Sequence, residues 1–567
     1  MTLRLANRRI RLLVALFAVL FAAALVRSAW LQAVEGPSLE GLASRQQRET
    51  VIRPSHRGTI YDRLGVQLAI GEQATTVYAN PTHIANPRAV APIIAADLDL
   101  DPGQVLEAIS DRSRGFVYVA RKVDTDKAKV LERRDIAGLG FYPEERRIYP
   151  QRRVASSVVG FAGIDNDGLA GLELAFNKEL TGRAGEETVV HDAQGRVIDV
   201  VTLRQVRDGR DLVLTIDNRL QARVEQALRR VRAAWGAKGA TAIVLDPRSG
   251  AVLALAQEPG FDANEYSSAY ASSPDSVRNK AVTDTYEPGS TFKVVTVAGA
   301  IEEGLVEPSS SFTLPYELQI ADRVIHDAEE RGTETMTVSE ILARSSNVGA
   351  VKLALLLERR RLAKWIKRFG FGHPTGIGFP GESRGIVLKP SDWTGSTIGN
   401  VPIGHGIAVT PIQMAAAYGV IANGGEWVEP RLVSRIGDDD APEPRRRRVL
   451  SVETARLVRT MMQGVVSDGT GVEAQVPGYT VAGKTGTAAK PEPTGGYSET
   501  RYVASFVGFV PARAPRLVIL VTVDEPQGEI WGGTVAAPAF REIAQFALEY
   551  FEVPPDAPET LPSTTAG

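Results

Sequence analysis

Hydrophobic residues form one unbroken segment near the N-terminus, whereas the rest of the chain mixes apolar and polar positions. The unbroken segment covers residues 12–26 and extends to Leu31 if the charged end of Arg27 reaches the bilayer surface. A helix of about 20 apolar residues spans a bilayer. Arginines precede the segment, and a basic flank stays in the cytoplasm. We therefore expect a cytoplasmic N-terminus at 1–11, a single transmembrane anchor at 12–31 and export of the remainder.

A cleaved signal peptide is the alternative interpretation of this segment. Its apolar length fits, and Ala22-Ala23-Ala24 offers the small residues of a cleavage site. Trp30 would lie at the membrane interface of an uncleaved helix, which favours the anchor. The flanking arginines disfavour the third alternative, a buried helix of a soluble protein.

From about residue 210 onward, the periodicity of the pattern predicts helices and strands. Residues 219–235 and 348–357 have the spacing of helices with one apolar face. Short apolar runs between turn signals predict strands. A helix followed by antiparallel strands is typical of an α+β domain, which we place at 210–552. The predicted strands cover 211–218, 241–245, 251–256, 502–510 and 517–523, and further helices cover 291–303 and 412–422.

The regions around this domain have weaker patterns. Residues 32–209 are mixed, and we expect them to form a separate N-terminal module. Residues 553–567 are rich in Pro, Ser and Thr and are predicted to be a disordered tail. Within the domain, residues 437–448 run from acidic residues to four arginines and predict a solvated loop. A binding role for those arginines is the less favoured alternative.

Composition excludes several functional classes. The chain has 567 residues, enough for three or four domains, and a formal net charge of −2, so nothing indicates nucleic-acid binding. It contains no cysteine, which excludes disulfides, lipid-anchored cysteines and thiolate metal sites. Its six histidines show no ligand spacing, and we expect neither a metal nor a cofactor. For His405, between two glycines, a structural role is at least as well supported as a catalytic one.

The first candidate for chemistry is a serine followed three residues later by a lysine. Pro288-Gly289 predicts a turn, so Ser290 begins the helix and Lys293 lies one turn further on, on the same face. A serine needs a neighbouring base to act as a nucleophile. Burial in an apolar helix lowers the pKa of a lysine and suits it for that task. Alone, the pair is weak evidence, because a solvated lysine at a helix start has the same pattern.

Two further polar motifs follow in the chain. Ser345-Ser346-Asn347 lies between two short apolar helices, as a plain connection or the wall of a site. Lys484-Thr485-Gly486-Thr487 enters a predicted strand, and its glycine allows another backbone to come close.

Together, these three motifs resemble the set of penicillin-binding proteins and serine β-lactamases. Residues Arg57 to Gly65 resemble part of the N-terminal module of class B, monofunctional penicillin-binding proteins. The segment Trp531-Gly532-Gly533 resembles the division-type members of that class. The resemblance implies an antiparallel sheet with helices for the transpeptidase domain, an elongated pedestal or dimerisation-type module at 32–209, and a periplasmic catalytic domain.

The resemblance also implies D,D-transpeptidation during septal cell-wall synthesis and acylation of Ser290 by β-lactams. Lys293 would be the base, Ser345 would relay a proton, Asn347 would hold the substrate and Lys484 would bind its carboxylate. The backbone N–H groups of Ser290 and Thr487 would form the oxyanion hole. The expected substrate-binding residues are Ser346, Thr485, Gly486, Thr487 and Trp531.

Implied partners are peptidoglycan stem peptides, a SEDS-family glycan polymerase, other membrane proteins of the division machinery, β-lactams and the membrane. Three alternatives remain open at this stage. One is an elongation-type transpeptidase, the second is a β-lactamase or β-lactam sensor, and the third is a non-catalytic scaffold of the division complex. The intact Ser290, Lys293 and Lys484 disfavour the scaffold.

Overall fold

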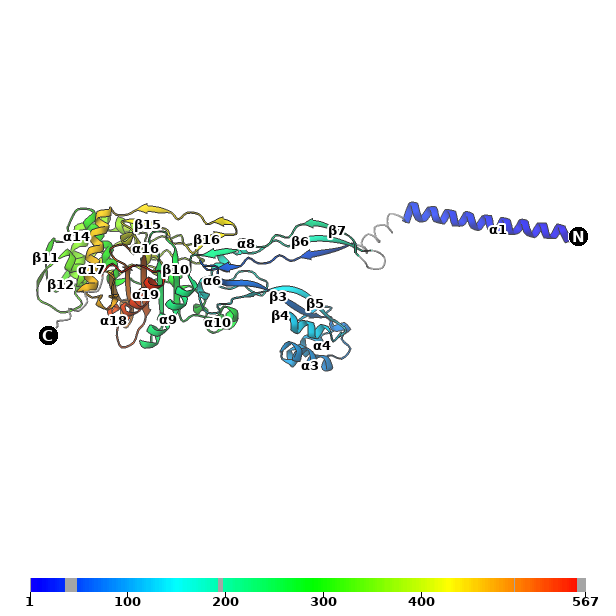
Figure 1. Cartoon of the computed structure of the whole chain (residues 1–567), viewed down its shortest axis with the longest axis horizontal. Helices are drawn as coiled ribbons and strands as arrows, with labels where there is room; N and C mark the ends of the chain where they lie inside the picture. The colour runs from blue at the N-terminus through cyan, green and yellow to red at the C-terminus, as the bar shows by residue number, and fades with distance from the viewer. Residues whose placement is uncertain (1, 36–47, 192–196, 494, 558–567) are drawn as a thin grey trace. The chain divides into compact units, whose positions relative to one another are not determined.

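The computed structural model describes residues 2–35, 48–191, 197–493 and 495–557 (Figure 1). Its internal contacts divide the chain into two units. The first unit comprises Met1–His56 and Gly182–Gly209, and the second comprises Arg57–Thr181 and Arg210–Gly567. Each unit is described separately.

The first unit contains the predicted membrane segment and a small sheet. Helix α1 (Thr2–Trp30) is followed by a π-helical turn, Leu31–Glu35. Within Asn7–Val34 it is long and apolar enough to cross a membrane, and none of its apolar window is buried. Strands β1 (Arg48–Arg53), β6 (Gly185–His191) and β7 (Val197–Arg204) form an antiparallel sheet in the order β1-β6-β7.

In the second unit, a seven-stranded sheet joins segments from both halves of the chain. Strands β2, β3, β4 and β5 come from the N-terminal half, and β8, β16 and β17 come from beyond residue 210. Helices α3, α4 and α5 pack on β3, β4 and β5 around Val77, Ile94 and Leu131. The bounds are β2 Ile60–Tyr61, β3 Gln67–Ala79, α3 Pro87–Leu98, α4 Pro102–Ser110, β4 Val117–Asp124, α5 Thr125–Glu132, β5 Leu139–Ile148, α6 Ser156–Val159, α7 Gly171–Ala175, α8 Asn177–Leu180, β8 Leu212–Leu214, β16 Val433–Ile436 and β17 Asp439–Asp440.

A buried ionic cluster explains the charged segment at Arg57. The guanidinium of Arg57 pairs with Glu173 at 2.6 Å, and Arg147 donates to the same carboxylate at 2.6 Å. The side chain of Arg57 also donates to Asn177 and Thr181. Loss of either side of a buried pair leaves an uncompensated charge, so this cluster holds the local fold in place. These contacts give Arg57, the first residue of the segment Arg57 to Gly65, a structural role.

The sheet that carries the motif Lys484 to Thr487 has five antiparallel strands in the order β10-β9-β21-β20-β19. Helices α9 and α19 cover one face through Leu220, Leu228 and Phe540. Helices α16 and α17 pack against the other face, α12 packs against α17, and α14 packs against α12. The bounds are α9 Asn218–Ala234, β9 Gly239–Leu245, β10 Val252–Glu258, α12 Lys293–Glu302, α14 Asn347–Arg368, α16 Pro411–Ala422, α17 Val452–Ser467, β19 Ala482–Pro491, β20 Tyr497–Val510, β21 Leu517–Asp524 and α19 Ala537–Tyr550.

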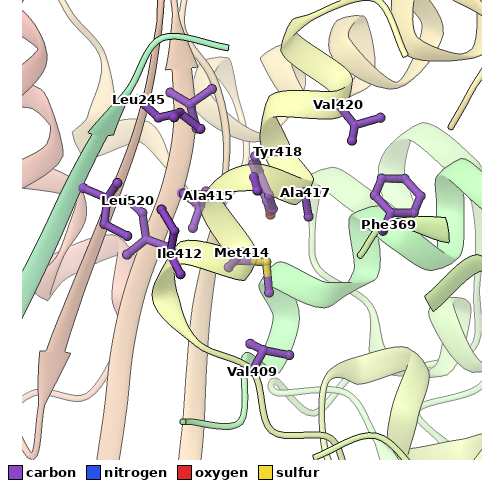
Figure 2. Packing of buried hydrophobic residues seen from close by; sticks show 14 of the residues in the cluster. Leu245, Phe369, Val409, Ile412, Met414, Ala415, Ala417, Tyr418, Val420 and Leu520 are labelled. Atoms are coloured by element: carbon purple, nitrogen blue, oxygen red, sulfur yellow. The ribbon is translucent and has the colours of Figure 1, made fainter. Parts of the chain in front are cut away.

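Helix α16 is the centre of this core. All twelve of its residues are buried. Figure 2 shows its Ile412 and Ala415 toward Leu245 and Leu520 of the sheet, with Phe369 beyond its other side. A helix that is apolar all round must be enclosed by other elements, as this one is.

Shorter elements complete this part of the chain. They include three strand pairs, β11 with β14, β12 with β13 and β15 with β18. Their bounds, with the short helices, are α10 Tyr266–Ser272, α11 Lys280–Thr283, β11 Ser311–Leu314, β12 Glu317–Ile320, β13 Arg323–His326, β14 Glu334–Thr337, α13 Val338–Ala343, α15 Thr397–Asn400, β15 Glu426–Val428, β18 Arg446–Arg448 and α18 Gly532–Val535.

Three sequence-based expectations need correction. The strand predicted at 211–218 is only Leu212–Leu214, because the Asp217 side chain caps helix α9. The predicted loop 437–448 contains strands β17 and β18, because backbone pairing does not depend on the charge of the side chains.

The third correction concerns the C-terminal tail. The described part of the predicted tail is fastened to the domain, since Tyr479 donates to the Val553 carbonyl at 2.6 Å and Asp556 accepts from Thr480 N at 2.6 Å. The predicted tail residues 558–567 lie outside the described residues.

Candidate active site

Ser290 is the second residue of a 3₁₀ turn, Gly289–Phe292, that leads directly into α12. Gly289 has φ +54°, and a Cβ there would lie 2.8 Å from the Thr487 carbonyl oxygen. Only glycine adopts such a backbone conformation at little cost while another strand lies so close. Tyr418 of α16 donates to the Thr291 carbonyl at 2.8 Å. The serine turn is thus held between β19 and the central helix.

Lys293 is the first residue of α12, and only 1% of it is exposed. Its ammonium group donates to the Ser345 carbonyl at 2.5 Å, to Ser345 Oγ at 3.1 Å and to Asn347 Oδ1 at 2.7 Å. Burial lowers the pKa of Lys293 to about 7, and the carboxylate of Asp327 opposes that shift. A lysine with such a pKa is neutral in about half of the molecules at pH 7 and can accept a proton.

The motif Ser345-Ser346-Asn347 forms the tight connection between α13 and α14. Ser345 has φ +61°, a left-handed conformation that costs a residue with a side chain free energy and is often found at functional sites. Asn347 is anchored on its other side, because its Nδ2 donates to the His326 carbonyl at 2.9 Å. The backbone of the motif therefore holds Ser345 and Asn347 in fixed positions against Lys293.

The structure places Ser346 away from its predicted role in substrate binding. Its side chain is buried, accepts a hydrogen bond from Gly349 N at 3.0 Å and donates to Asp327. It is the N-cap of α14. A buried hydroxyl that caps a helix and donates its one proton to a carboxylate has no proton left for substrate, so we infer a structural role.

Asp327 is the main residue that the sequence analysis missed. Its buried carboxylate accepts from Asn347 N at 2.5 Å and from Val348 N at 3.0 Å, at the start of α14. Arg331 pairs with it at 2.5 Å and also donates to the Leu314 carbonyl at 2.9 Å. A carboxylate at a helix N-terminus is favoured by the helix dipole. No spacing rule relates Asp327 to a motif 19 residues later, so the sequence offers no signal for it.

Lys484 and Thr485 lie on β19, an edge strand of the five-stranded sheet. Lys484 is fully buried, and its Nζ donates to Thr485 Oγ1 at 3.2 Å. Burial, followed by the nearby charge of Lys293, holds the pKa of Lys484 well below its usual value. A bound carboxylate would favour the ammonium form again. Thr485 Oγ1 also lies 2.7 Å from Thr470 Oγ1, so Thr470 is a second neighbour that the sequence analysis missed.

Thr487, the last residue of the motif Lys484 to Thr487, contacts the segment at Trp531. Thr487 Oγ1 accepts a hydrogen bond from Gly532 N at 3.1 Å. A Cβ on Gly486 would lie 2.4 Å from Ser505 Oγ, so this strand position requires glycine. Trp531 is 49% exposed and caps the short helix α18. An exposed indole beside the motif is available for a ligand.

The structure brings most predicted residues into one site but leaves one gap. Lys293 contacts Ser345 and Asn347, and Gly289 lies against Thr487. Within the described residues, no hydrogen bond joins Ser290 Oγ to Lys293. Catalytic hydrogen bonds are often long before substrate binds and shorten in the complex, so the gap does not exclude the pair.

His405 belongs to a polar cluster beside this site. Its Nδ1 lies 2.9 Å from the carboxylate of Glu287, which also accepts from Gly406 N at 3.0 Å and from the Tyr497 hydroxyl at 3.2 Å. Burial is the main reason that the pKa of Tyr497 rises to about 12. These bonds tie the residue before Pro288 to the loop at His405, as a structural histidine would.

Comparison with known proteins identifies the family. The family model of the penicillin binding protein transpeptidase domain matches residues 240–545, and that of the penicillin-binding protein dimerisation domain matches residues 52–214. The chain is a class B penicillin-binding protein. It is a serine-type D-Ala-D-Ala transpeptidase with the α+β fold expected from the sequence.

Similar proteins match this penicillin-binding protein over nearly its whole length. Peptidoglycan D,D-transpeptidase FtsI of Escherichia coli is 33% identical over 94% of this chain and 90% of its own length. Stage V sporulation protein D of Bacillus subtilis is 35% identical over 98% of this chain and 88% of its own. The crystal structure of penicillin binding protein 3 from Mycobacterium tuberculosis complexed with aztreonam has a TM-score of 0.70 and 30% identity, and the match covers 91% of this chain and 100% of that one.

In this penicillin-binding protein, Asp327→Asn should slow acylation. The asparagine keeps one oxygen for Asn347 N, but it loses the charge that faces Arg331 and Lys293. We expect the acylation rate with a fluorescent penicillin to fall roughly 10- to 100-fold, because small displacements of catalytic groups are costly.

The pH dependence of the acylation rate distinguishes a role of Asp327 in positioning Lys293 from a purely structural role. Removing the negative charge of Asp327 lowers the pKa of Lys293 further, so the acid limb of the acylation profile should move to lower pH. Asp392 is an exposed carboxylate in the same unit, and Asp392→Asn should change neither the acylation rate nor the position of the acid limb. A lower melting temperature with an unmoved acid limb would contradict the positioning role.

Proposed function

We propose that the protein cross-links peptidoglycan stem peptides during septal wall synthesis, and that β-lactams acylate Ser290 in place of the substrate. The contacts of buried Lys293 with Ser345 and Asn347 support the acylation part of this proposal, because Lys293 follows Ser290 by one helical turn. The similarity to FtsI and the segment at Trp531 support the septal role.

The proposed acylation begins with neutral Lys293. Ser290 Oγ attacks the carbonyl carbon between the two D-alanines, and its proton passes to Lys293. The negative oxygen that develops is stabilised by the backbone N–H groups of Ser290 and Thr487. The C–N bond then breaks, Ser345 relays a proton to the departing D-alanine amine, and an ester to Ser290 remains.

The second half of the reaction reverses these proton movements. An amine of a neighbouring stem peptide attacks the ester, loses its proton to the same base and forms the cross-link, and Ser290 leaves as a hydroxyl.

Lys484, with the hydroxyls of Thr485 and Thr487, binds the terminal carboxylate of the donor peptide. Asn347, Gly486 and Trp531 are proposed to contact the peptide itself.

The proposed setting is the plasma membrane. Helix α1 would anchor the chain with residues 1–11 in the cytoplasm, residues 32–209 as a pedestal and residues 210–552 as the periplasmic catalytic domain. A SEDS-family glycan polymerase and other division proteins would be its membrane partners. The basic residues before the apolar segment support this orientation.

Depletion of the protein in its own host tests the septal role. Filamentous cells that elongate without dividing are expected, whereas loss of rod shape would favour an elongation role instead. Complementation by wild-type protein but not by Ser290→Ala would exclude the scaffold. Steady hydrolysis of a chromogenic β-lactam by purified protein would contradict the transpeptidase proposal and favour a β-lactamase.

A further inference from the structure

A second concave site lies between the C-terminal half of α14 and strand β18. It is a cavity of about 1090 Å³, and none of the site residues proposed above lines it. In the part of the chain that the structure describes, its lining contains no carboxylate. The cationic residues that line it are Arg360, Lys364, Lys367, Arg368, Arg445, Arg446 and Arg447. We call it the basic cavity.

The local fold gathers these cations from two elements. Helix α14 is interrupted at Glu358, where φ is +63°, and its second half carries cations at spacings of three and four residues. Residues with that spacing share one helix face. Strand β18 pairs with β15 so that Arg447 lies opposite Trp427. Part of the arginine run that the sequence predicts to be solvated therefore lines the cavity.

Two of the seven cations have acidic partners at the edge of the cavity. Arg445 pairs with Glu429 at 2.6 Å, and Arg446 lies 3.4 Å from Glu426. Among the described residues, the other five have no ion pair with a carboxylate. The basic cavity therefore has a large excess of positive charge.

Arg368 and Arg447 are fixed in place by neutral groups. Arg447 donates to the Arg368 carbonyl, and Arg368 donates to the Val449 carbonyl at 2.7 Å. The Arg447 guanidinium lies 4.6 Å from the ring centre of buried Trp427. Burial and the neighbouring charge of Arg368 lower the pKa of Arg447. Two adjacent guanidinium groups repel each other, and a bound anion would remove that cost.

We propose that the basic cavity binds a ligand that carries several phosphate groups, as a phosphodiester polymer or a lipid headgroup does. Guanidinium groups held in fixed orientation match phosphate oxygens through paired hydrogen bonds. Five uncompensated cations call for a multiply charged ligand, and the cavity is of the size that small-molecule sites have. Phosphate is favoured over an acidic peptide because the oxygens of one tetrahedral phosphate can accept hydrogen bonds from both guanidinium groups of the Arg368–Arg447 pair.

Calorimetric titration of the detergent-solubilised full chain with sodium tripolyphosphate tests the proposal. We expect saturable binding at one site. Arg447→Gln should weaken it by roughly tenfold or more, the effect of one lost charged hydrogen bond. Lys364→Gln combined with Lys367→Gln should weaken it similarly, and both lysines are exposed, so this variant keeps the fold. Arg541→Gln, an exposed charge on α19 outside the cavity, is the matched control.

Further arms of the experiment identify the source of the phosphate. Selective binding to vesicles that contain cardiolipin, a lipid with more than one phosphate group, would indicate a lipid headgroup, and tight binding of a glycerol phosphate oligomer would indicate a polymer. The proposal is overturned if the wild type does not bind tripolyphosphate, if Arg541→Gln reduces binding as much as Arg447→Gln, or if an oligoglutamate binds more tightly. Penicillin labelling at Ser290 should be equal in all variants, which verifies their fold independently of the cavity.

Discussion

Replacing Ser290 by alanine should abolish covalent labelling by penicillin and transpeptidation together. No other hydroxyl can take its place in the turn, because Thr291 is buried and donates to the Pro288 carbonyl at 2.8 Å. Loss of the nucleophile in a serine acyl-transfer enzyme costs about 10⁶ in rate, which takes acylation below detection. Intact-protein mass spectrometry after incubation with a penicillin measures the result directly.

The control for this prediction is Ser272→Ala. Ser272 is an exposed serine in the same unit and lies outside the proposed site. Wild type and Ser272→Ala should each gain one stable adduct, mapped to the peptide that contains Ser290. An adduct of the same mass on Ser290→Ala would show that another residue is the nucleophile. Unchanged melting temperatures would exclude unfolding as the cause of lost labelling.

The placement of Ser290 one turn before Lys293 could be predicted because it depends on local structure. The turn at Pro288-Gly289 and the apolar residues at helical spacing after it predict the helix over 291–303, and α12 covers Lys293–Glu302. Spacing by three residues within one turn then puts both groups on one side. Recognition of the two later motifs as parts of the same site depended on the family resemblance, since no local rule joins segments so far apart.

Asp327 could not be predicted because its role arises from tertiary contacts. It follows the β12–β13 hairpin, which folds back so that the carboxylate meets the N-terminus of α14. The expectation that Ser346 binds substrate is wrong for a related reason. A serine that caps a helix and a serine that faces a ligand look identical in sequence, and only the contact with Gly349 N separates them.

The second large effect concerns Lys293. If its neutral amine is the base, acylation should follow its deprotonation, with a midpoint near the pKa of about 7. The rate should then reach a plateau above pH 8 and fall about tenfold for each pH unit below 6, where the amine is mostly protonated. A neutral amine keeps two N–H donors for the Ser345 carbonyl and Asn347, and its lone pair is free for the serine proton.

Lys293→Met tests the same idea by removing the amine and keeping the apolar length of the side chain. Acylation should fall by roughly 100- to 10,000-fold, the usual contribution of a general base, and the residual rate should lose its dependence on pH near neutrality. Lys490→Met, which removes a lysine paired with Asp524 outside the catalytic motifs, should leave both the rate and the pH midpoint unchanged. A Lys293→Met enzyme that retains the wild-type acid limb would place the titrating base elsewhere, and Glu287, which binds His405 and Tyr497 beside the serine turn, would be the next group to substitute.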